Sequence, residues 1–308
     1  MSDHRRTMGI VNDIQRMCTC DGPGFRTTVF LKGCPLACKW CHNPEGKRRY
    51  PEVIPFVSNC DSCGDCVEAC AHGALSLNDN DKPVVDYGLC TTCLQCVEAC
   101  GKEGLAVWGS MVTVDDIHAE VFSDAPFFKN SGGGVTVSGG EPMLQPDFVR
   151  ALFQCAREEQ VGTALDTCGH VDWALYEKVL DLTDLVLLDI KHMNSAAHRA
   201  YTGAGNERIL DNAKRIAERG VSLRIRIPVI PGTNDTRENW RETARFAESL
   251  GDAVQGVDLL PYHPYAGGKY VSFGMAYDFP AGEGYDDEAL EPVIDLFLDH
   301  VCEVTIGG

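Results

Sequence analysis

The stretch Cys34-Pro-Leu-Ala-Cys38-Lys-Trp-Cys41 places three thiols at a three-then-two spacing. No fourth cysteine stands near enough along the chain to complete a tetrahedral zinc site. A four-iron four-sulfur cluster held by only three thiolates keeps one iron open, and an open coordination position can bind a small molecule and pass it an electron. The spacing therefore favours a reactive cluster. An incomplete zinc site and three unrelated buried thiols are the alternatives.

Two further cysteine runs follow, each with the spacing Cys-x2-Cys-x2-Cys-x3-Cys: Cys60, Cys63, Cys66 and Cys70, then Cys90, Cys93, Cys96 and Cys100. This spacing resembles that of two-cluster bacterial ferredoxins, in which the fourth cysteine of each run binds the other cluster. Zinc knuckles, the alternative, usually show two close pairs separated by a longer loop. The resemblance implies two 4Fe-4S ligand sets: Cys60, Cys63, Cys66 and Cys100, and Cys90, Cys93, Cys96 and Cys70.

The two runs also look like a duplicated unit. Cys-Val-Glu-Ala-Cys occurs at 66–70 and again at 96–100, and each copy is followed by a small apolar stretch. The unit comes directly after the first cysteine motif. We therefore expect a ferredoxin-like insertion over 56–108, within a larger domain formed by 1–55 and 109–308.

Composition narrows the class of protein. At 308 residues the chain can form one large α/β domain and a small module, and its formal net charge of −18 disfavours nucleic acid and anionic membrane surfaces as partners. No run approaches the roughly 18 apolar residues of a membrane span, and no apolar run follows the arginines at 5–6. With 16 cysteines and no export signal, we expect a cytoplasmic protein that uses thiols as metal ligands.

Outside the insertion, short apolar runs alternate with amphipathic stretches, which predicts repeated βα units. The predicted strands are 27–31, 134–137, 162–166, 185–190, 223–227 and 256–260. The predicted helices are 113–122, 145–158, 172–181, 208–219 and 237–249. Six such units fit a parallel barrel that lacks two of its eight strands, with the chemistry at the carboxyl ends of the strands. Periodicity alone does not distinguish this barrel from a doubly wound sheet.

Polar motifs follow several of these strands. Ser138-Gly139-Gly140-Glu141-Pro142 follows the second strand, Asp166-Thr167-Cys168-Gly169-His170 ends the third, and Asp189-Ile190-Lys191 ends the fourth. Arg226 lies on the fifth strand and His263 follows the sixth. Each has an ordinary structural alternative: a tight turn for the glycines, a salt bridge for the aspartates and the lysine, and a core position for the histidine.

These motifs, together with Asp21-Gly22-Pro23-Gly24-Phe25-Arg26-Thr27 and His42-Asn43-Pro44-Glu45, resemble those of the radical S-adenosylmethionine superfamily. Within it, the combination is similar to the glycyl radical enzyme activating enzymes, from about Asp21 to Tyr270. The resemblance implies a partial (β/α)6 TIM-like barrel. It also implies an oxidoreductase that reductively cleaves S-adenosylmethionine to a 5′-deoxyadenosyl radical, which abstracts hydrogen from a glycine of a partner enzyme.

The resemblance also assigns roles to residues. The Cys34, Cys38 and Cys41 cluster would bind S-adenosylmethionine, whose other contacts would fall on eight positions: Gly139, Gly140, Glu141, Asp166, Asp189, Lys191, Arg226 and His263. The Gly-Gly-Glu element would hold the amino group, Lys191 and Arg226 would face the carboxylate, and His263 would contact the ribose or adenine. No general base or nucleophile is required.

The resemblance further implies three 4Fe-4S clusters, an electron donor such as flavodoxin or ferredoxin, and a monomer. Simple activases of pyruvate formate-lyase lack the insertion, which favours a lyase, dehydratase, decarboxylase or fumarate-adding synthase as partner. The alternatives are a radical enzyme with auxiliary clusters that modifies a peptide or small molecule, and an electron-transfer protein on an inert barrel. Five cysteines outside the patterns are expected to be small buried thiols: Cys18, Cys20, Cys155, Cys168 and Cys302.

Overall fold

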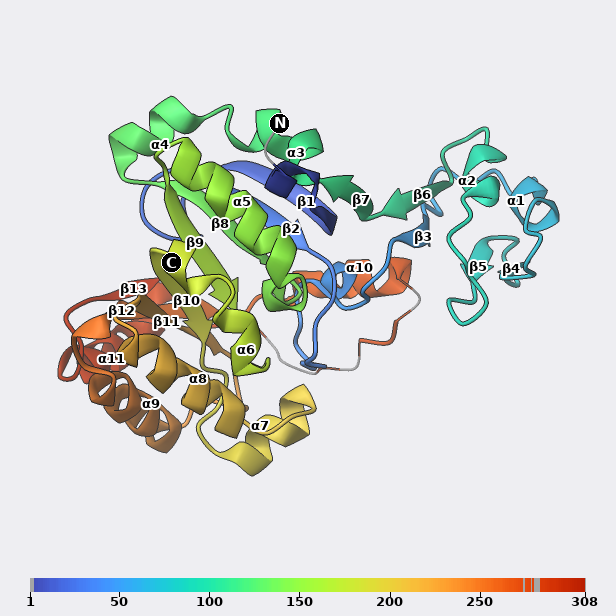
Figure 1. Ribbon diagram of the computed structural model, residues 1–308. Helices are drawn as coiled ribbons and strands as arrows, with labels where there is room; N and C mark the ends of the chain where they lie inside the picture. Colours follow the sequence, from blue (N-terminus) through green and yellow to red (C-terminus); the bar gives the residue numbers. More distant parts are fainter. Residues whose placement is uncertain (1–2, 274, 278, 280–282, 308) are drawn as a thin grey trace.

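The computed structural model describes residues 3–273, 275–277, 279 and 283–307. Its centre is a nine-stranded mixed sheet (Figure 1), whose strands in spatial order are β13 (Val304–Ile306), β12 (Val254–Pro261), β11 (Ser222–Val229), β10 (Leu185–Asp189), β9 (Gly162–Thr167), β8 (Gly134–Gly139), β2 (Arg26–Leu31), β1 (Met8–Cys18) and β7 (Ser110–Thr113). Seven strands of this sheet are mutually parallel: β2, β8, β9, β10, β11, β12 and β13. At one side of the sheet, β1 pairs antiparallel with β2 and with the edge strand β7. The fold class is therefore α/β.

The six predicted strands correspond to β2 and β8–β12. These strands carry buried β-branched residues and leucines, as expected for parallel strands covered on both faces. The sequence analysis did not predict β1, β7 or β13. In β1 most side chains are exposed or half-buried and the pairing with β2 contains register shifts, so the strand lacks a clean alternating pattern.

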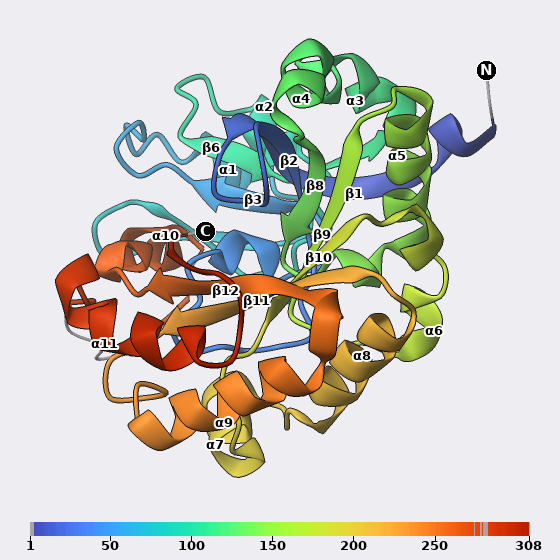
Figure 2. The same ribbon diagram turned by 90° about the vertical axis from the view of Figure 1, so that its left-hand side faces the viewer.

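Helices lie along the outer side of the sheet (Figure 2), where apolar residues of α5 pack against β8 and β9 in the main core. The helices of this domain are α3 (Val114–Val121), α4 (Ala125–Ser131), α5 (Pro146–Glu158), α6 (Trp173–Tyr176), α7 (Ser195–Thr202), α8 (Glu207–Glu218), α9 (Arg237–Ser249), α10 (Gly267–Ser272) and α11 (Asp287–Leu298). No helix among the described residues is long and apolar enough to cross a bilayer.

One predicted helix was wrong in length. The sequence predicts a helix over 172–181, but the chain forms only α6 and a separate 3-10 turn at Leu180–Leu182. Val179 leaves the helical conformation with φ −123°, and the carbonyl of Lys178 accepts a hydrogen bond from Arg150 instead of continuing the helix. Tertiary contacts thus override a sequence with adequate helical periodicity.

The chain from Glu52 to Trp108 forms a lobe that projects from the main body (Figure 1). It contains two small antiparallel sheets and two short helices: β3 (Glu52–Pro55) with β6 (Leu105–Trp108), β4 (Leu75–Leu77) with β5 (Pro83–Val85), α1 (Asp65–Glu68) and α2 (Gln95–Glu98). The residue before each helix has a left-handed backbone, Gly64 with φ +84° and Leu94 with φ +67°. The duplicated sequence therefore adopts a repeated local geometry.

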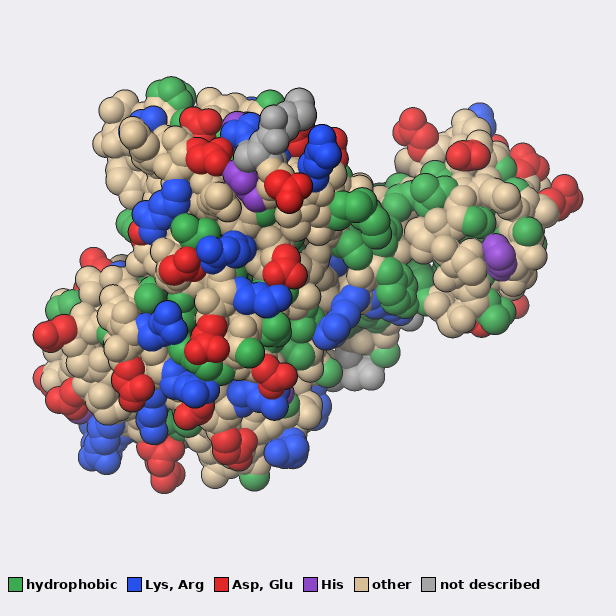
Figure 3. Space-filling model, viewed as in Figure 1, with side chains coloured by type: hydrophobic (Ala, Val, Ile, Leu, Met, Phe, Trp, Pro, Cys, Tyr) green, Lys and Arg blue, Asp and Glu red, His purple; other side chains and the backbone are tan. Residues whose placement is uncertain are grey.

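The base of this lobe contains a buried ion pair. Lys32, which follows β2, donates to Glu52 of β3 with Nζ and Oε2 2.7 Å apart, and both side chains are fully buried. Lys32 Nζ also donates to the carbonyl of Glu45, and Arg48 contacts the second oxygen of Glu52. On the face shown in Figure 3, several acidic side chains lie at the margin of the other end of the lobe. The network thus ties the lobe to the strand that precedes the first cysteine motif.

Candidate functional site

A cavity of about 560 Å³ opens at the carboxyl ends of the parallel strands. Its walls come from the loop after β2 and from the ends of β8 to β12. The lining residues include Cys34, Cys38, Trp40, Cys41, His42, Ser138, Gly139, Gly140, Asp166, Cys168, Asp189, Lys191, Arg226, Tyr262 and His263. Seven of the eight residues predicted to contact a cofactor are in this set, and Glu141 is not.

The three thiols of the first motif lie together in this cavity. Burial raises the pKa of Cys38 to about 12 and also raises the pKa of Cys41, whereas Lys191 opposes the rise at both. Cys34 differs, because a hydrogen bond with the Cys168 thiol lowers its pKa. Buried thiols so close to one another fit a positively charged metal core, which would compensate their negative charge as thiolates.

The loop after β8 approaches the cysteine loop very closely. A Cβ on Gly140 would lie 2.3 Å from the carbonyl oxygens of both Gly33 and Gly46, so no side chain fits there. Gly139 has φ +117°, and a Cβ there would meet the backbone of Leu31 at 2.3 Å. Glycine is therefore required at both positions to bring this loop against the cavity.

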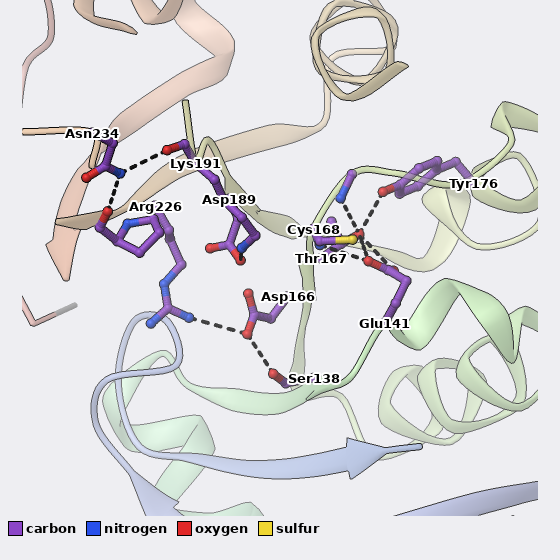
Figure 4. Close-up of polar contacts among 12 residues, drawn as sticks. Ser138, Glu141, Asp166, Thr167, Cys168, Tyr176, Asp189, Lys191, Arg226 and Asn234 are labelled. Carbon is purple, nitrogen blue, oxygen red and sulfur yellow. Dashed lines mark hydrogen bonds and ion pairs between the residues drawn. The ribbon is translucent and has the colours of Figure 1, made fainter. Parts of the chain in front are cut away.

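Glu141 turns away from the cavity into the protein (Figure 4). Its side chain is fully buried and accepts hydrogen bonds from the backbone nitrogens of Met143 and Cys168, at 3.0 and 2.8 Å, and from Thr167 Oγ1. Burial raises the pKa of Glu141, although these hydrogen bonds oppose the rise. The carboxylate therefore ties the loop after β8 to the end of β9.

Asp166 and Arg226 form an ion pair in the lining of the cavity (Figure 4). Arg226 Nη1 lies 3.4 Å from Asp166 Oδ2, and Ser138 Oγ donates to the same carboxylate at 2.6 Å. Burial raises the pKa of Asp166 to about 6, although the charge of Arg226 opposes the rise. A guanidinium and a carboxylate therefore lie side by side in the cavity lining.

Lys191 and Asp189 form an ion pair with Nζ and Oδ2 2.5 Å apart, and Lys191 is only 9% exposed. Burial acts to lower the pKa of Lys191, but Asp189 and the thiols of Cys38 and Cys168 together raise it. Asn234 supports this segment by donating to the carbonyl of Lys191 at 2.9 Å. The salt bridge considered as the structural alternative is present, and it lies in the cavity wall.

His263 stacks on His42, with ring centroids 4.0 Å apart. Burial lowers the pKa of His42 to about 4, and the neighbouring His263 adds to this effect, so His42 is neutral at pH 7. Because both rings line the cavity, the pair presents a flat aromatic surface beside the cysteine loop.

Two buried polar atoms of the cavity have no hydrogen-bond partner within the described part of the chain: Arg226 Nε and His42 Nε2. A buried unpartnered donor is costly, so such atoms commonly mark the position of a ligand. Cationic, carboxylate, hydroxyl and aromatic groups line the same cavity as the three thiols. This donor set suits a cluster together with a zwitterionic nucleoside ligand.

The cysteines of the lobe line two hollows. One is lined by Cys60, Cys63, Cys66 and Cys100, and the other by Cys70, Cys90, Cys93 and Cys96. Burial raises the pKa of Cys66, with added contributions from Cys100 and Cys60. It raises that of Cys96 to about 11, with contributions from Cys70 and Cys90. The fourth cysteine of each run therefore lies with the first three of the other run.

Sequence reasoning missed several cavity residues. The motifs assign no role to Trp40 or His42, and the sequence predicts Cys168 only as a small buried thiol. A cysteine at the end of a predicted barrel strand was the available signal for Cys168. The expectation of a small buried thiol is confirmed for Cys155 and Cys168 and is wrong for Cys20 and Cys302, which are exposed, whereas Cys18 is half-buried.

Comparison with known proteins agrees with this geometry. Residues 94–247 match the model of the radical SAM superfamily, and residues 59–103 match that of a 4Fe-4S dicluster domain. The fold, the cavity and these matches define a radical S-adenosylmethionine protein with additional cluster-binding sequence.

Curated relatives define the family more closely. The chain is 41% identical to an isethionate sulfite-lyase activating enzyme of Oleidesulfovibrio alaskensis, over 96% of each chain. It is 39% identical to a (2S)-3-sulfopropanediol dehydratase activating enzyme of Klebsiella oxytoca, over 87% of this chain and 86% of the relative. It is also 39% identical to a benzylsuccinate synthase activating enzyme of Thauera aromatica, over 97% and 92%. The protein belongs to the glycyl radical enzyme activating enzymes.

Proposed function

We propose that this protein activates one glycyl radical enzyme by abstracting hydrogen from a backbone glycine of that partner. The observation that carries the proposal is the convergence of Cys34, Cys38 and Cys41 with Lys191 and Arg226 in one cavity at the strand ends. When bound there, a three-thiolate 4Fe-4S cluster with S-adenosylmethionine supplies a 5′-deoxyadenosyl radical by reductive cleavage.

The residues of the cavity would bind and orient the nucleoside ligand. Arg226 and Lys191 offer cationic groups for its carboxylate, and the unpartnered Nε of Arg226 supports this role. Gly139 and Gly140 let the backbone approach the amino group, which Asp166 and Asp189 would also attract. His263, stacked on His42, provides a surface for the ribose or adenine. Glu141 would act indirectly, by fixing the loops on both sides of it.

A backbone glycine is a suitable target for energetic reasons. A primary carbon radical is much less stable than a backbone radical flanked by an amide nitrogen and a carbonyl, so hydrogen transfer runs downhill. The protein then needs to supply positioning and exclusion of water, for which a cavity with buried walls is suited.

We further propose that 56–108 is a ferredoxin-like insertion within a partial (β/α)6 barrel formed by 1–55 and 109–308. The two hollows support the ligand sets Cys60, Cys63, Cys66, Cys100 and Cys90, Cys93, Cys96, Cys70, which would bring the total to three 4Fe-4S clusters. Backbone N–H groups donate to Cys60, Cys70 and Cys100, as expected for thiolate ligands. These clusters would relay electrons to the cavity or shape the docking surface.

The other members of the reaction are proposed from the same resemblance. A flavodoxin or ferredoxin would donate the electron, and the protein would act as a monomer in the cytoplasm, where thiols stay reduced. The relatives activate a sulfite-lyase, a dehydratase and a synthase, which supports a partner of the lyase, dehydratase, decarboxylase or fumarate-adding class.

The proposal is tested with the anaerobically reconstituted protein, dithionite and S-adenosylmethionine. We expect 5′-deoxyadenosine by chromatography, and a glycyl radical by EPR once the partner encoded nearby is added. Arg226→Ala should weaken S-adenosylmethionine binding by at least about tenfold. Arg237→Ala, an exposed arginine on α9, is the control. Reduction of carrier proteins without any 5′-deoxyadenosine would instead identify an electron-transfer protein.

A further inference from the structure

The cavity contains a fourth thiol, which no cysteine motif of the chain includes. Cys168 follows β9, more than 120 positions from the triad, and is only 5% exposed. It lines the same cavity as Cys34, Cys38 and Cys41 and packs with them in one cluster of buried side chains. The interaction between the two thiols lowers the pKa of Cys34 and raises that of Cys168.

The fold holds Cys168 firmly in this position (Figure 4). Its backbone nitrogen donates to Glu141 Oε2 at 2.8 Å, and the preceding Thr167 Oγ1 donates to the same carboxylate. Thr167 Oγ1 is also 2.7 Å from the hydroxyl of Tyr176, and the nitrogen of Gly169 donates to it at 3.1 Å. A fully buried network therefore fixes the backbone on both sides of the thiol.

We propose that Cys168 is a positioning residue for the reactive cluster, whose thiol donates a hydrogen bond to Cys34 Sγ and thereby makes that cluster easier to reduce. The inference rests on the proposed function, because it assumes that Cys34 is a cluster ligand. It adds a contact between the protein and the cluster that the three-cysteine motif does not contain.

The physical basis is the charge around the cluster. Hydrogen bonds to ligand sulfurs are among the main determinants of the reduction potential of an iron-sulfur cluster, because they stabilise the added negative charge. The carboxylates of Asp166 and Asp189 line the same cavity, and they would make reduction harder. Lys191 opposes them from one side, paired with Asp189. The Cys168 thiol would also oppose the effect of the carboxylates, through its hydrogen bond to the ligand Cys34.

The test is an EPR-monitored potentiometric titration of the fully reconstituted protein. The signal of the open-iron cluster is recognised by its change when S-adenosylmethionine is added. We expect Cys168→Ala to be harder to reduce. At the midpoint potential of the wild type, its ratio of reduced to oxidised cluster should be about three- to tenfold lower, and a tenfold change corresponds to a shift of about 59 mV for one electron. Cys168→Ser keeps a donor and should restore most of the ratio. Cys155→Ala, also fully buried but outside the cavity, should leave it unchanged.

Three results would overturn the inference: an unshifted potential in Cys168→Ala, a serine variant that shifts as far as alanine, or the loss of four irons per chain in Cys168→Ala. The last would make Cys168 a ligand, and Mössbauer spectra would then show no open iron in the wild type. The proposed function fails separately. If Cys168→Ala shows the expected shift in potential but the wild type forms no 5′-deoxyadenosine, the proposed function is contradicted and the contact between Cys168 and Cys34 is supported. If the wild type forms 5′-deoxyadenosine but Cys168→Ala shows no shift, the function is supported and the contact is contradicted.

Discussion

The cavity and the lobe carry the same kind of side chain in very different surroundings. In the cavity, the neighbours of Cys34 and Cys38 come from distant strands: Cys168 after β9 and Lys191 after β10. In the lobe, the neighbours are local or belong to the repeated half, and both Cys63 and Cys93 are exposed. The surroundings of the cavity thiols are therefore formed by several strands of the sheet, whereas those of the lobe thiols are formed by a few local turns.

This difference fits the roles that we propose for the two regions. A cluster that activates a ligand needs charged groups that several strand ends bring together, and the parallel sheet supplies them at one edge. A cluster that only carries electrons needs thiols and backbone donors, such as the N–H of Ser62 two residues beyond Cys60. Changes in the cavity should therefore abolish chemistry, whereas changes in the lobe should lower rate or stability.

The strongest contrast should come from Cys38→Ser. Cys38 is buried in the cavity, and its loss removes one of only three thiols for the reactive cluster. We expect 5′-deoxyadenosine formation to fall at least about 1000-fold, which corresponds to about 4 kcal/mol of barrier. Product is measured by chromatography, and iron content should fall by one cluster.

Cys302→Ser is the matched control, because Cys302 is exposed and its thiol donates only to the carbonyl of Gln255. It should keep wild-type iron and activity. A Cys38→Ser protein that still forms product at more than a tenth of the normal rate would remove the distinction between the two regions.

The second prediction concerns the junction of the two regions. Lys32→Met leaves Glu52 buried with Arg48 as its remaining cationic partner. Removing one member of a buried pair costs about 3–5 kcal/mol, because the other charge stays desolvated. The free energy of unfolding, measured anaerobically by denaturant titration, should fall by that amount.

Lys178→Met provides the comparison, since Lys178 pairs with Asp147 at 3.0 Å but both side chains are largely exposed. It should change the free energy of unfolding by less than about 1 kcal/mol. Equal losses in the two variants would show that the buried pair does not anchor the lobe.

The same contrast explains what the sequence could predict. The six parallel strands were predictable because their short runs are rich in β-branched residues and leucine, and the cysteine runs were predictable because spacing alone defines them. The edge strands β7 and β13 and the neighbouring strand β1 were not predicted, since partly exposed strands leave little pattern. The length of the helix at 172–181 depended on tertiary contacts of Lys178 and Val179, which periodicity does not contain.

In the cavity, sequence motifs located the strand ends but not the direction of each side chain. In the motif after β8, the two glycines at 139 and 140 line the cavity, whereas the side chain of Glu141 points into the protein. Lys191, which follows β10, also lines the cavity. Cys168 and Cys34 meet only because β9 and the loop after β2 end at the same edge of the sheet. Such contacts are set by three-dimensional packing, so a single sequence leaves them undetermined.

A smaller effect should follow from changing an exposed thiol of the lobe. If the lobe relays electrons, Cys93→Ser should lower 5′-deoxyadenosine formation about tenfold with a protein reductant such as flavodoxin, while dithionite, a small reductant that can reach the cavity, restores most of it. Cys20→Ser, exposed and outside every run, is the control. Unchanged product with both reductants would rule out the relay.

The smallest predicted effect tests the repeated turn of the lobe. Gly64 has φ +84°, and no heavy atom lies within 4 Å of where a Cβ would be, so Gly64→Ala adds backbone strain without a clash. The left-handed conformation costs a non-glycine residue about 1–2 kcal/mol, which should appear as a loss in the free energy of unfolding. Leu94 already bears this strain at the equivalent place in the second half, with φ +67°.

Gly101→Ala is the control for this turn, because that position is equally open but lies outside the left-handed region. It should change the free energy of unfolding by less than about 0.5 kcal/mol. If Gly101→Ala cost as much as Gly64→Ala, the left-handed backbone of Gly64 would not explain the loss of stability. Crowding would not explain it either, because both positions are open, in contrast to the cavity, where the glycine at 140 is required because the backbone at Gly33 and Gly46 leaves no room for a side chain.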